Sequence, residues 1–186
     1  VQLVGRHHDG RVLGAEELGV DGNDFRFYDS GTARSTMAAS SHVRRANPRD
    51  AVAMAAAVLP RHLLFRRAYP YAEKDPDGTV LREGLLFMAC CADIRRQFEF
   101  VQAHWLQDGN RYGLGYERDS IVGTRRPPDD ADGSDLGRDH VSVTDPSHPE
   151  LRTHRRMASF VTTRGGEYFL LPSRSALRLL GDPRGC

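Results

Sequence analysis

The sequence has few cysteines and no long apolar run, and each shortage excludes a class of protein. Three cysteines occur in 186 residues. Cys90 and Cys91 are adjacent and Cys186 is terminal, so their spacing provides neither a disulfide framework nor a set of metal ligands. No apolar stretch approaches the roughly 20 residues that a membrane-spanning helix needs. These shortages predict a protein of the reducing cytoplasm that has no membrane partner.

Lysine is almost absent as well, because Lys74 is the only one and all other basic residues are arginine. An excess of arginine is a feature of proteins that bind phosphate or nucleic acid. Here 25 acidic residues are interspersed with 26 basic ones, and the formal net charge is +1. No strong positive field results, so the composition argues against a nucleic-acid partner. The chain begins at Val1 rather than at a methionine, and we expect the natural N-terminus to lie further upstream.

The length of the chain favours one domain over residues 1–186, with enough residues for a hydrophobic core. Glycine, proline and aspartate dominate the stretch that includes Pro127-Pro-Asp-Asp-Ala-Asp-Gly133. Such residues favour turns and irregular backbone over packed elements. We therefore expect a mobile loop over residues 124–157.

The first half of the chain predicts a short helix followed by a β-hairpin. Residues 50–59 are mostly alanine, valine and methionine after an aspartate, and Pro60 should end the helix. Residues 62–71 and 81–92 are rich in apolar and aromatic side chains. The turn-forming sequence Asp75-Pro-Asp-Gly78 lies between them. The second apolar run is typical of a buried strand.

The second half predicts two helices and a further strand. Asp93 is a suitable N-cap for a helix whose apolar stripe is Ile94, Phe98, Val101 and Trp105. Residues 158–171 have strand-like composition, broken at Arg164-Gly-Gly166. Residues 173–180 form a last helix that Gly181 ends. Strand pairs that alternate with helices indicate an α+β fold, with an antiparallel sheet covered by helices on one face.

Histidine 42 is the centre of the candidate site, because it lies in a basic segment that should turn sharply. Pro48 prevents an α-helix from continuing through Asn47. A neutral imidazole can bind iron through one nitrogen while the other donates a hydrogen bond. Three nearby arginines are suited to binding carboxylates such as haem propionates; they are Arg44, Arg45 and Arg49. On spacing alone, a solvated histidine on a surface loop is the simpler explanation of the segment.

The segment Ser41-His-Val-Arg-Arg-Ala-Asn-Pro-Arg49 resembles the proximal-histidine motif of the dye-decolourising (DyP-type) haem peroxidases. Further segments resemble that family in the same order, so the likeness extends over nearly the whole chain. They are Val4–Gly10, Gly84–Met88, Gln97–Gln102 with Trp105, and Thr163–Phe169 closing on Leu171-Pro172. The resemblance implies one ferredoxin-like half of a two-half fold, the C-terminal half, which holds haem b.

The resemblance also assigns roles to individual residues. It implies that His42 is the axial ligand of the haem iron and that Asp119 is the hydrogen-bond partner of its outer nitrogen. Arg66 matches the distal arginine that stabilises bound peroxide, and Leu85 and Phe87 would line the distal pocket. The implied reaction reduces hydrogen peroxide and oxidises phenols, dyes or similar small donors. A homo-oligomer is compatible with this assignment.

Three points stay open at the level of the sequence: the choice of arginine, the activity of the chain alone, and its function. Arg67 is adjacent to Arg66 and would point the other way on a strand, so the choice between them depends on the strand's orientation. The family's Gly-x-x-Asp-Gly motif is absent: Asp9-Gly10 and Asp21-Gly22 lack a glycine at the required offset. The chain therefore resembles the C-terminal part of a longer peroxidase and is expected to be inactive alone. A non-catalytic haem-binding domain and a cofactor-free interaction module are the rival functions.

Overall fold

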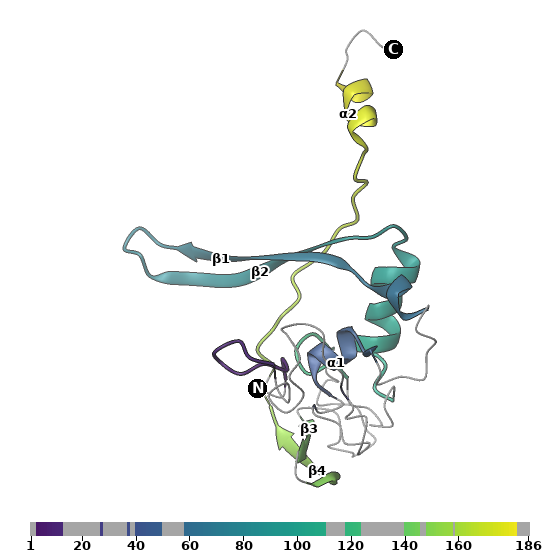
Figure 1. The fold of residues 1–186 in the computed structure, drawn as a ribbon. Helices are drawn as coiled ribbons and strands as arrows, with labels where there is room; N and C mark the ends of the chain where they lie inside the picture. The colour runs from purple at the N-terminus through teal and green to yellow at the C-terminus, as the bar shows by residue number, and fades with distance from the viewer. Residues whose placement is uncertain are drawn as a thin grey trace, which may run out of the picture.

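A computed structural model describes most of the chain, with helices and strands connected in the order shown in Figure 1. The order is α1 (His42–Ala46), η2 (Leu59–His62), β1 (Phe65–Lys74), β2 (Val80–Cys90), η3 (Arg95–Glu99), η4 (Val101–Leu106), β3 (His140–Asp145), β4 (His148–Arg156) and α2 (Arg174–Leu180). The described residues are 3–12, 27, 37, 40–49, 58–110, 118–123, 140–145, 148–157 and 159–181.

Strands β1 and β2 form the predicted antiparallel hairpin. Phe65 is opposite Cys90 and the pairing runs without interruption to Glu73 opposite Arg82. At the turn the Asp75 carboxylate accepts hydrogen bonds from the backbone N–H groups of Asp77 at 3.0 Å and Thr79 at 2.8 Å. An aspartate that satisfies the turn's own donors is the reason this sequence reverses direction here.

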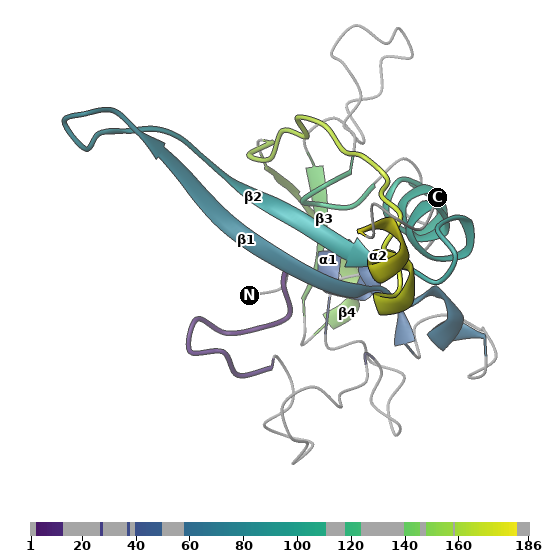
Figure 2. The ribbon, with the colours of Figure 1, turned by 90° about the horizontal axis from the view of Figure 1, so that it is seen from above.

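The prediction that residues 81–92 form a buried strand is wrong. Most of strand β2 is exposed, and only Gly84 and Ala89 within it are partly covered. Figures 1 and 2 show the hairpin extending away from the other elements at its turn end. Among the described residues no third strand pairs with either edge. An apolar run specifies a strand through its side chains, but burial depends on a partner that the run itself does not specify.

The predicted helix after Asp93 is present and consists of the segments η3 and η4. The Asp93 carboxylate accepts a hydrogen bond from the backbone N–H of Arg96 at 3.0 Å, as an N-cap does. Backbone bonds such as Glu99 N–H to the Ile94 carbonyl span five residues, so much of the helix has π-type geometry. The C-terminal half of the stripe, Val101 and Trp105, is buried and forms the core cluster together with Leu106.

Trp105 is the largest fully buried side chain among the described residues. Its large volume and its indole N–H predict different losses of stability for replacement by alanine and by phenylalanine. Its indole N–H has no hydrogen-bond partner in the described part of the chain. We expect Trp105→Ala to reduce the free energy of unfolding by about 3–5 kcal/mol, because it leaves a cavity. Trp105→Phe keeps most of the volume and loses no hydrogen bond, so about 1–2 kcal/mol is expected. Urea unfolding measures both, and equal losses would contradict this account.

The expected loop over residues 124–157 contains regular structure. Residues 140–145 and 148–156 form the antiparallel strands β3 and β4, with Val141 buried. The expectation of a loop is therefore wrong for these strands, while residues 124–139 and 146–147 lie outside the described residues. Alternating residues in His140-Val-Ser-Val-Thr-Asp145 carry the strand signal, which the surrounding glycine, proline and aspartate obscured.

The structure of the C-terminal region agrees with the prediction in part. Residues 159–171 make no ladder hydrogen bonds among the described residues, so the predicted strand is absent there. The segment is attached to η3 through Tyr168, whose hydroxyl donates to Glu99 at 3.2 Å. Burial, and then this hydrogen bond, raises the pKa of Tyr168. Helix α2 is as predicted: Ser173 accepts from the Ala176 N–H, and Gly181 follows the last turn.

Two other expectations are limited by what the structure describes. Of the helix predicted over residues 50–59, residues 50–57 lie outside the described part. Pro60 lies near the start of the 3₁₀ segment η2. Among the described helices, none is long and apolar enough to cross a membrane.

Candidate functional site

Helix α1 carries His42 at its first position and is a single short turn that the N-terminal segment anchors. The backbone N–H of His42 donates to the Leu3 carbonyl at 3.0 Å, and the Ser41 hydroxyl donates to the same carbonyl at 3.1 Å. The helix ends at Ala46, and Pro48 follows two residues later. Proline cannot adopt or support the next helical turn, so the sequence itself fixes where His42's helix stops.

The structure brings His42 and Asp119 together although 77 positions separate them in the sequence. Nδ1 of His42 lies 2.9 Å and 3.0 Å from the two carboxylate oxygens of Asp119. An ionised carboxylate only accepts hydrogen bonds, so Nδ1 carries the proton and donates. In a neutral ring Nε2 is then left with a lone pair that can bind a metal. This is the tautomer that an axial histidine requires.

Asp119 is held by its own loop as well as by His42. Its side chain is fully buried, whereas that of His42 is 32% exposed. The Asp119 carboxylate also accepts from the backbone N–H groups of Ile121 at 2.9 Å and Val122 at 2.8 Å. Gly123 donates to the Asp119 carbonyl, and a Cβ at Gly123 would collide with that backbone. The carboxylate therefore has one orientation, with His42 as its side-chain partner.

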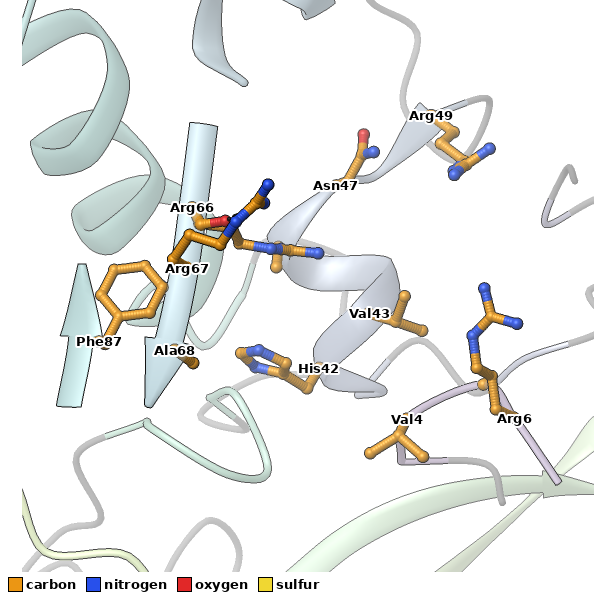
Figure 3. A pocket seen from close by; sticks show the side chains of 12 residues that line it. Val4, Arg6, His42, Val43, Asn47, Arg49, Arg66, Arg67, Ala68 and Phe87 are labelled. Atoms are coloured by element: carbon orange, nitrogen blue, oxygen red, sulfur yellow. Dashed lines mark hydrogen bonds between the residues drawn. The ribbon is translucent and has the colours of Figure 1, made fainter. Parts of the chain in front are cut away.

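A cavity of about 530 Å³ separates helix α1 from the hairpin, and His42 lies on its wall (Figure 3). Twelve residues line it: Val4, Gly5, Arg6, His42, Val43, Ala46, Asn47, Arg49, Arg66, Arg67, Ala68 and Phe87. Four of the twelve are arginines, so the lining is strongly positive. The size falls within the range of small-molecule and cofactor sites, and the charge favours an anionic ligand.

The hairpin register distinguishes the two adjacent arginines of β1. Arg66 is opposite Ala89 and Ala68 is opposite Phe87, so these residues share one face of the ribbon. The guanidinium of Arg67 lies over the Phe65 ring, 5.1 Å from its centre. Because Phe65 and Arg67 are two residues apart, that contact belongs to the opposite face. Arg66 therefore shares its face with Phe87, although Arg67 lines the cavity as well.

Leu85 does not line the cavity, although the sequence grouped it with Phe87. It lies opposite Pro70 further along the hairpin and is 62% exposed. The two-residue spacing places Leu85 and Phe87 on the same face, as expected, but the cavity ends at Phe87 and Ala68.

Two of the three arginines expected to bind propionates have other roles. Arg44 and Arg45 are 4% and 0% exposed, and neither lines the cavity. Arg44 donates to the Met37 carbonyl at 2.7 Å, and Arg45 donates to the Trp105 carbonyl at 3.0 Å. That expectation is therefore wrong for both residues, because their guanidinium groups are buried and donate hydrogen bonds to backbone carbonyls. Arg49 does line the cavity.

Sequence reasoning assigned no role to Gly5 and Arg6, which the structure places at the cavity. Gly5 has a positive φ of 70°, and a Cβ there would lie 2.8 Å from the Val43 side chain. Glycine is the residue that permits this backbone to pass so close to α1. No local pattern indicates that contact, because Val43 is distant in the sequence.

The fold and site define a class of α+β protein in which a carboxylate-paired histidine faces a basic cavity. Residues 2–115 match the family model described as "Dyp-type peroxidase, C-terminal". The chain belongs to this family, the DyP-type peroxidases, whose members are haem enzymes. The resemblance seen in the sequence is thus confirmed at the level of the family, and the α+β, ferredoxin-like fold class is confirmed with it.

Two curated relatives agree with this assignment. The "Multifunctional dye peroxidase DyP2" of Amycolatopsis sp. (strain ATCC 39116 / 75iv2) is 33% identical over 201 residues, which covers 96% of this chain and 40% of that protein. The "Dye-decolorizing peroxidase msp1" of Mycetinis scorodonius is 32% identical over 166 residues, covering 84% of this chain and 32% of that one. The chain thus spans well under half the length of either relative.

Solved structures share the fold. DyP2 from Amycolatopsis sp. ATCC 39116 superimposes with a TM-score of 0.56 at 24% identity, covering 85% of this chain and 35% of that one. The DyP-type peroxidase of Anabaena sp. gives a TM-score of 0.60 at 23% identity, covering 86% and 33%.

Proposed function

We propose that this chain supplies the histidine-ligating part of a haem-dependent peroxidase that reduces hydrogen peroxide and oxidises phenolic or dye-like donors. The observation that carries the proposal is the 2.9 Å contact between His42 Nδ1 and the buried Asp119 carboxylate. A buried carboxylate behind a histidine is the usual outer partner of a metal-bound imidazole, because it fixes the ring and increases its basicity.

The residues around the cavity fit haem b. His42 would hold the iron through Nε2, and it lines the cavity of about 530 Å³. Arg6 and Arg49 line it and carry the planar, permanently charged groups that bind carboxylates such as propionates. Phe87 and Ala68 add apolar surface suited to a porphyrin face. No residue in this set conflicts with an anionic, largely apolar macrocycle.

Each residue would have a definite task in the reaction. Haem supplies the iron that binds peroxide and accepts its oxidising equivalents. Asp119 holds the proton of Nδ1 and lends the ring partial imidazolate character, which favours the higher oxidation states of iron. Arg66 would supply a fixed positive charge that stabilises negative charge on the peroxide oxygens. Phe87 would offer an apolar surface on that side. We assign none of these 186 residues to moving the peroxide proton, because the Gly-x-x-Asp-Gly motif is absent.

A haem titration of the whole protein, expressed from its native gene, tests the proposal. Stepwise addition of haem to the apoprotein should give a saturable Soret band at one haem per chain. Hydrogen peroxide should then react with the loaded protein much faster than with free haem, and a phenolic donor should be consumed. Binding without accelerated peroxide turnover would favour a non-catalytic haem-binding domain. Absence of binding would overturn the haem assignment.

Replacing Asp119 tests its effect on the iron separately. We expect Asp119→Asn to retain haem but to raise the Fe(III)/Fe(II) reduction potential, because a neutral amide stabilises the ferric state less. Each tenfold loss of that preference raises a one-electron potential by about 60 mV. Spectroelectrochemical titration measures the shift. Asp77→Asn, which removes an equal charge at the exposed hairpin turn, serves as the control. An unchanged potential in Asp119→Asn would separate this carboxylate from the iron.

A further inference from the structure

Arg45 is fully buried on the same helix as His42, three residues further along, and it binds the end of another helix. Its Nε donates to the Trp105 carbonyl at 3.0 Å, and its Nη2 donates to the Asp108 carbonyl at 2.5 Å. Carbonyls at a helix C-terminus lack intrahelical partners and carry partial negative charge. A guanidinium is well suited to that position, because it offers several donors in one plane and a permanent positive charge.

Asp119 is attached to the same helix end by the next carbonyl in the chain. The backbone N–H of Asp119 donates to the Leu106 carbonyl at 2.8 Å. The Gln107 side chain adds a second link by donating to the Val122 carbonyl at 3.2 Å, just beyond the loop that holds Asp119. Two consecutive carbonyls therefore lie behind the histidine–carboxylate pair: that of Trp105 binds Arg45 on the helix that carries His42, and that of Leu106 binds Asp119 itself.

We propose that Arg45 is a positioning residue that sets the hydrogen bond between His42 and Asp119. The guanidinium fixes α1 relative to the end of η4, and η4 fixes Asp119, so the separation of the two side chains depends on Arg45. In the absence of this connection, α1 can move relative to Asp119 and the Nδ1 hydrogen bond weakens. The inference deepens the proposed function and rests on it for its effect on haem. The hydrogen bond itself requires no haem.

Arg44 provides a matched control. It is a neighbouring arginine on the same short helix and is also buried. Its guanidinium donates to the Met37 carbonyl, not to the helix end, and lies 6.0 Å from the Phe27 ring centre. Truncation of either arginine removes a buried charge and the same number of atoms. A merely structural contribution would make Arg44→Met and Arg45→Met equivalent at His42.

The first experiment uses the apoprotein of the whole chain, labelled with ¹⁵N-histidine. The wild-type spectrum should contain a downfield, slowly exchanging Nδ1–H resonance that His42→Gln removes. Arg45→Met should abolish this resonance, and Arg44→Met should leave it in place. Arg45→Lys keeps the charge and one donor, so it should preserve a weakened resonance. An intact resonance in Arg45→Met, or equal loss in Arg44→Met, would overturn the proposal.

The second experiment uses the haem-loaded protein and reads the iron–histidine stretching frequency of the ferrous form. Arg45→Met should lower this frequency towards that of Asp119→Asn and weaken haem retention about tenfold, as loss of outer partners does at metal sites. The double variant should have the frequency of Asp119→Asn alone, because Arg45 acts through the carboxylate. Additive shifts would contradict this role.

The two experiments separate failure of this proposal from failure of the proposed function. If the wild-type protein binds no haem but Arg45→Met still abolishes the Nδ1–H resonance, the positioning role stands and the peroxidase proposal falls. If haem binds and the resonance persists in Arg45→Met, the positioning role falls and the haem assignment stands. If Arg45→Met does not fold, Arg45→Lys decides: a full-strength resonance overturns the role and a weakened one supports it.

Discussion

Replacing His42 with alanine is expected to abolish retention of haem by the whole protein. The imidazole is the proposed axial ligand, and its Nε2 lone pair is available because Asp119 holds the proton on Nδ1. The arginines and apolar residues of the cavity remain in His42→Ala, but they supply no bond to iron. The absorbance of the Soret band per mole of purified protein measures the effect, and we expect it to fall close to zero.

His8→Ala is the control for that measurement, because His8 is exposed and lies outside the cavity. It should retain the wild-type Soret absorbance. Added imidazole should restore part of the haem binding in His42→Ala, since it can occupy the place of the missing ring. An unchanged Soret band in His42→Ala would remove this residue from the iron site.

The second large effect concerns Arg66, whose replacement by leucine should leave haem bound and slow its reaction with peroxide. Loss of one donor that stabilises developing charge typically lowers a rate by about 10²–10³-fold. Leucine keeps part of the side-chain bulk but removes the charge, so the change tests the charge of Arg66. Stopped-flow mixing of the ferric protein with hydrogen peroxide measures the second-order rate constant directly.

Arg67→Leu is the matched control for Arg66. Arg67 also lines the cavity, but its guanidinium lies over the ring of Phe65 on the other face of the ribbon, so we expect a smaller loss of peroxide rate than in Arg66→Leu. The register of the hairpin thus gives the prediction its direction. The opposite result, a slow Arg67→Leu and a normal Arg66→Leu, would transfer the role to the neighbouring arginine.

Local signals predicted the elements whose causes are local. Asp93 and Ser173 cap helices through their own side chains, and Asp75 organises the hairpin turn through bonds to residues two and four positions away. Each of these interactions lies within one short segment, so sequence spacing contains the information. Pro48 likewise ends α1 by its own covalent geometry.

Contacts between residues distant in the sequence could be predicted only in part. The family motif drew attention to His42 and Asp119, and the structure places them in contact across 77 positions. The attachment of Arg45 to Trp105 had no such signal, because every residue offers a backbone carbonyl and none is marked as an acceptor. Burial of β2 was mispredicted for a related reason: apolar side chains favour burial, but whether they are buried depends on another surface that packs against them.

The exposed hairpin has a consequence for how this chain behaves at high concentration. Both outer edges of the β1–β2 ribbon offer unpaired backbone donors and acceptors among the described residues, and both faces carry large apolar groups. Such edges are templates for intermolecular strand addition, which leads to self-association and eventually to aggregation. The glutamate and arginine side chains near the turn oppose this through solvation, whereas Phe65 and Met88 are exposed apolar groups near the other end of the ribbon. We therefore expect charged substitutions on this ribbon to reduce self-association of the isolated chain.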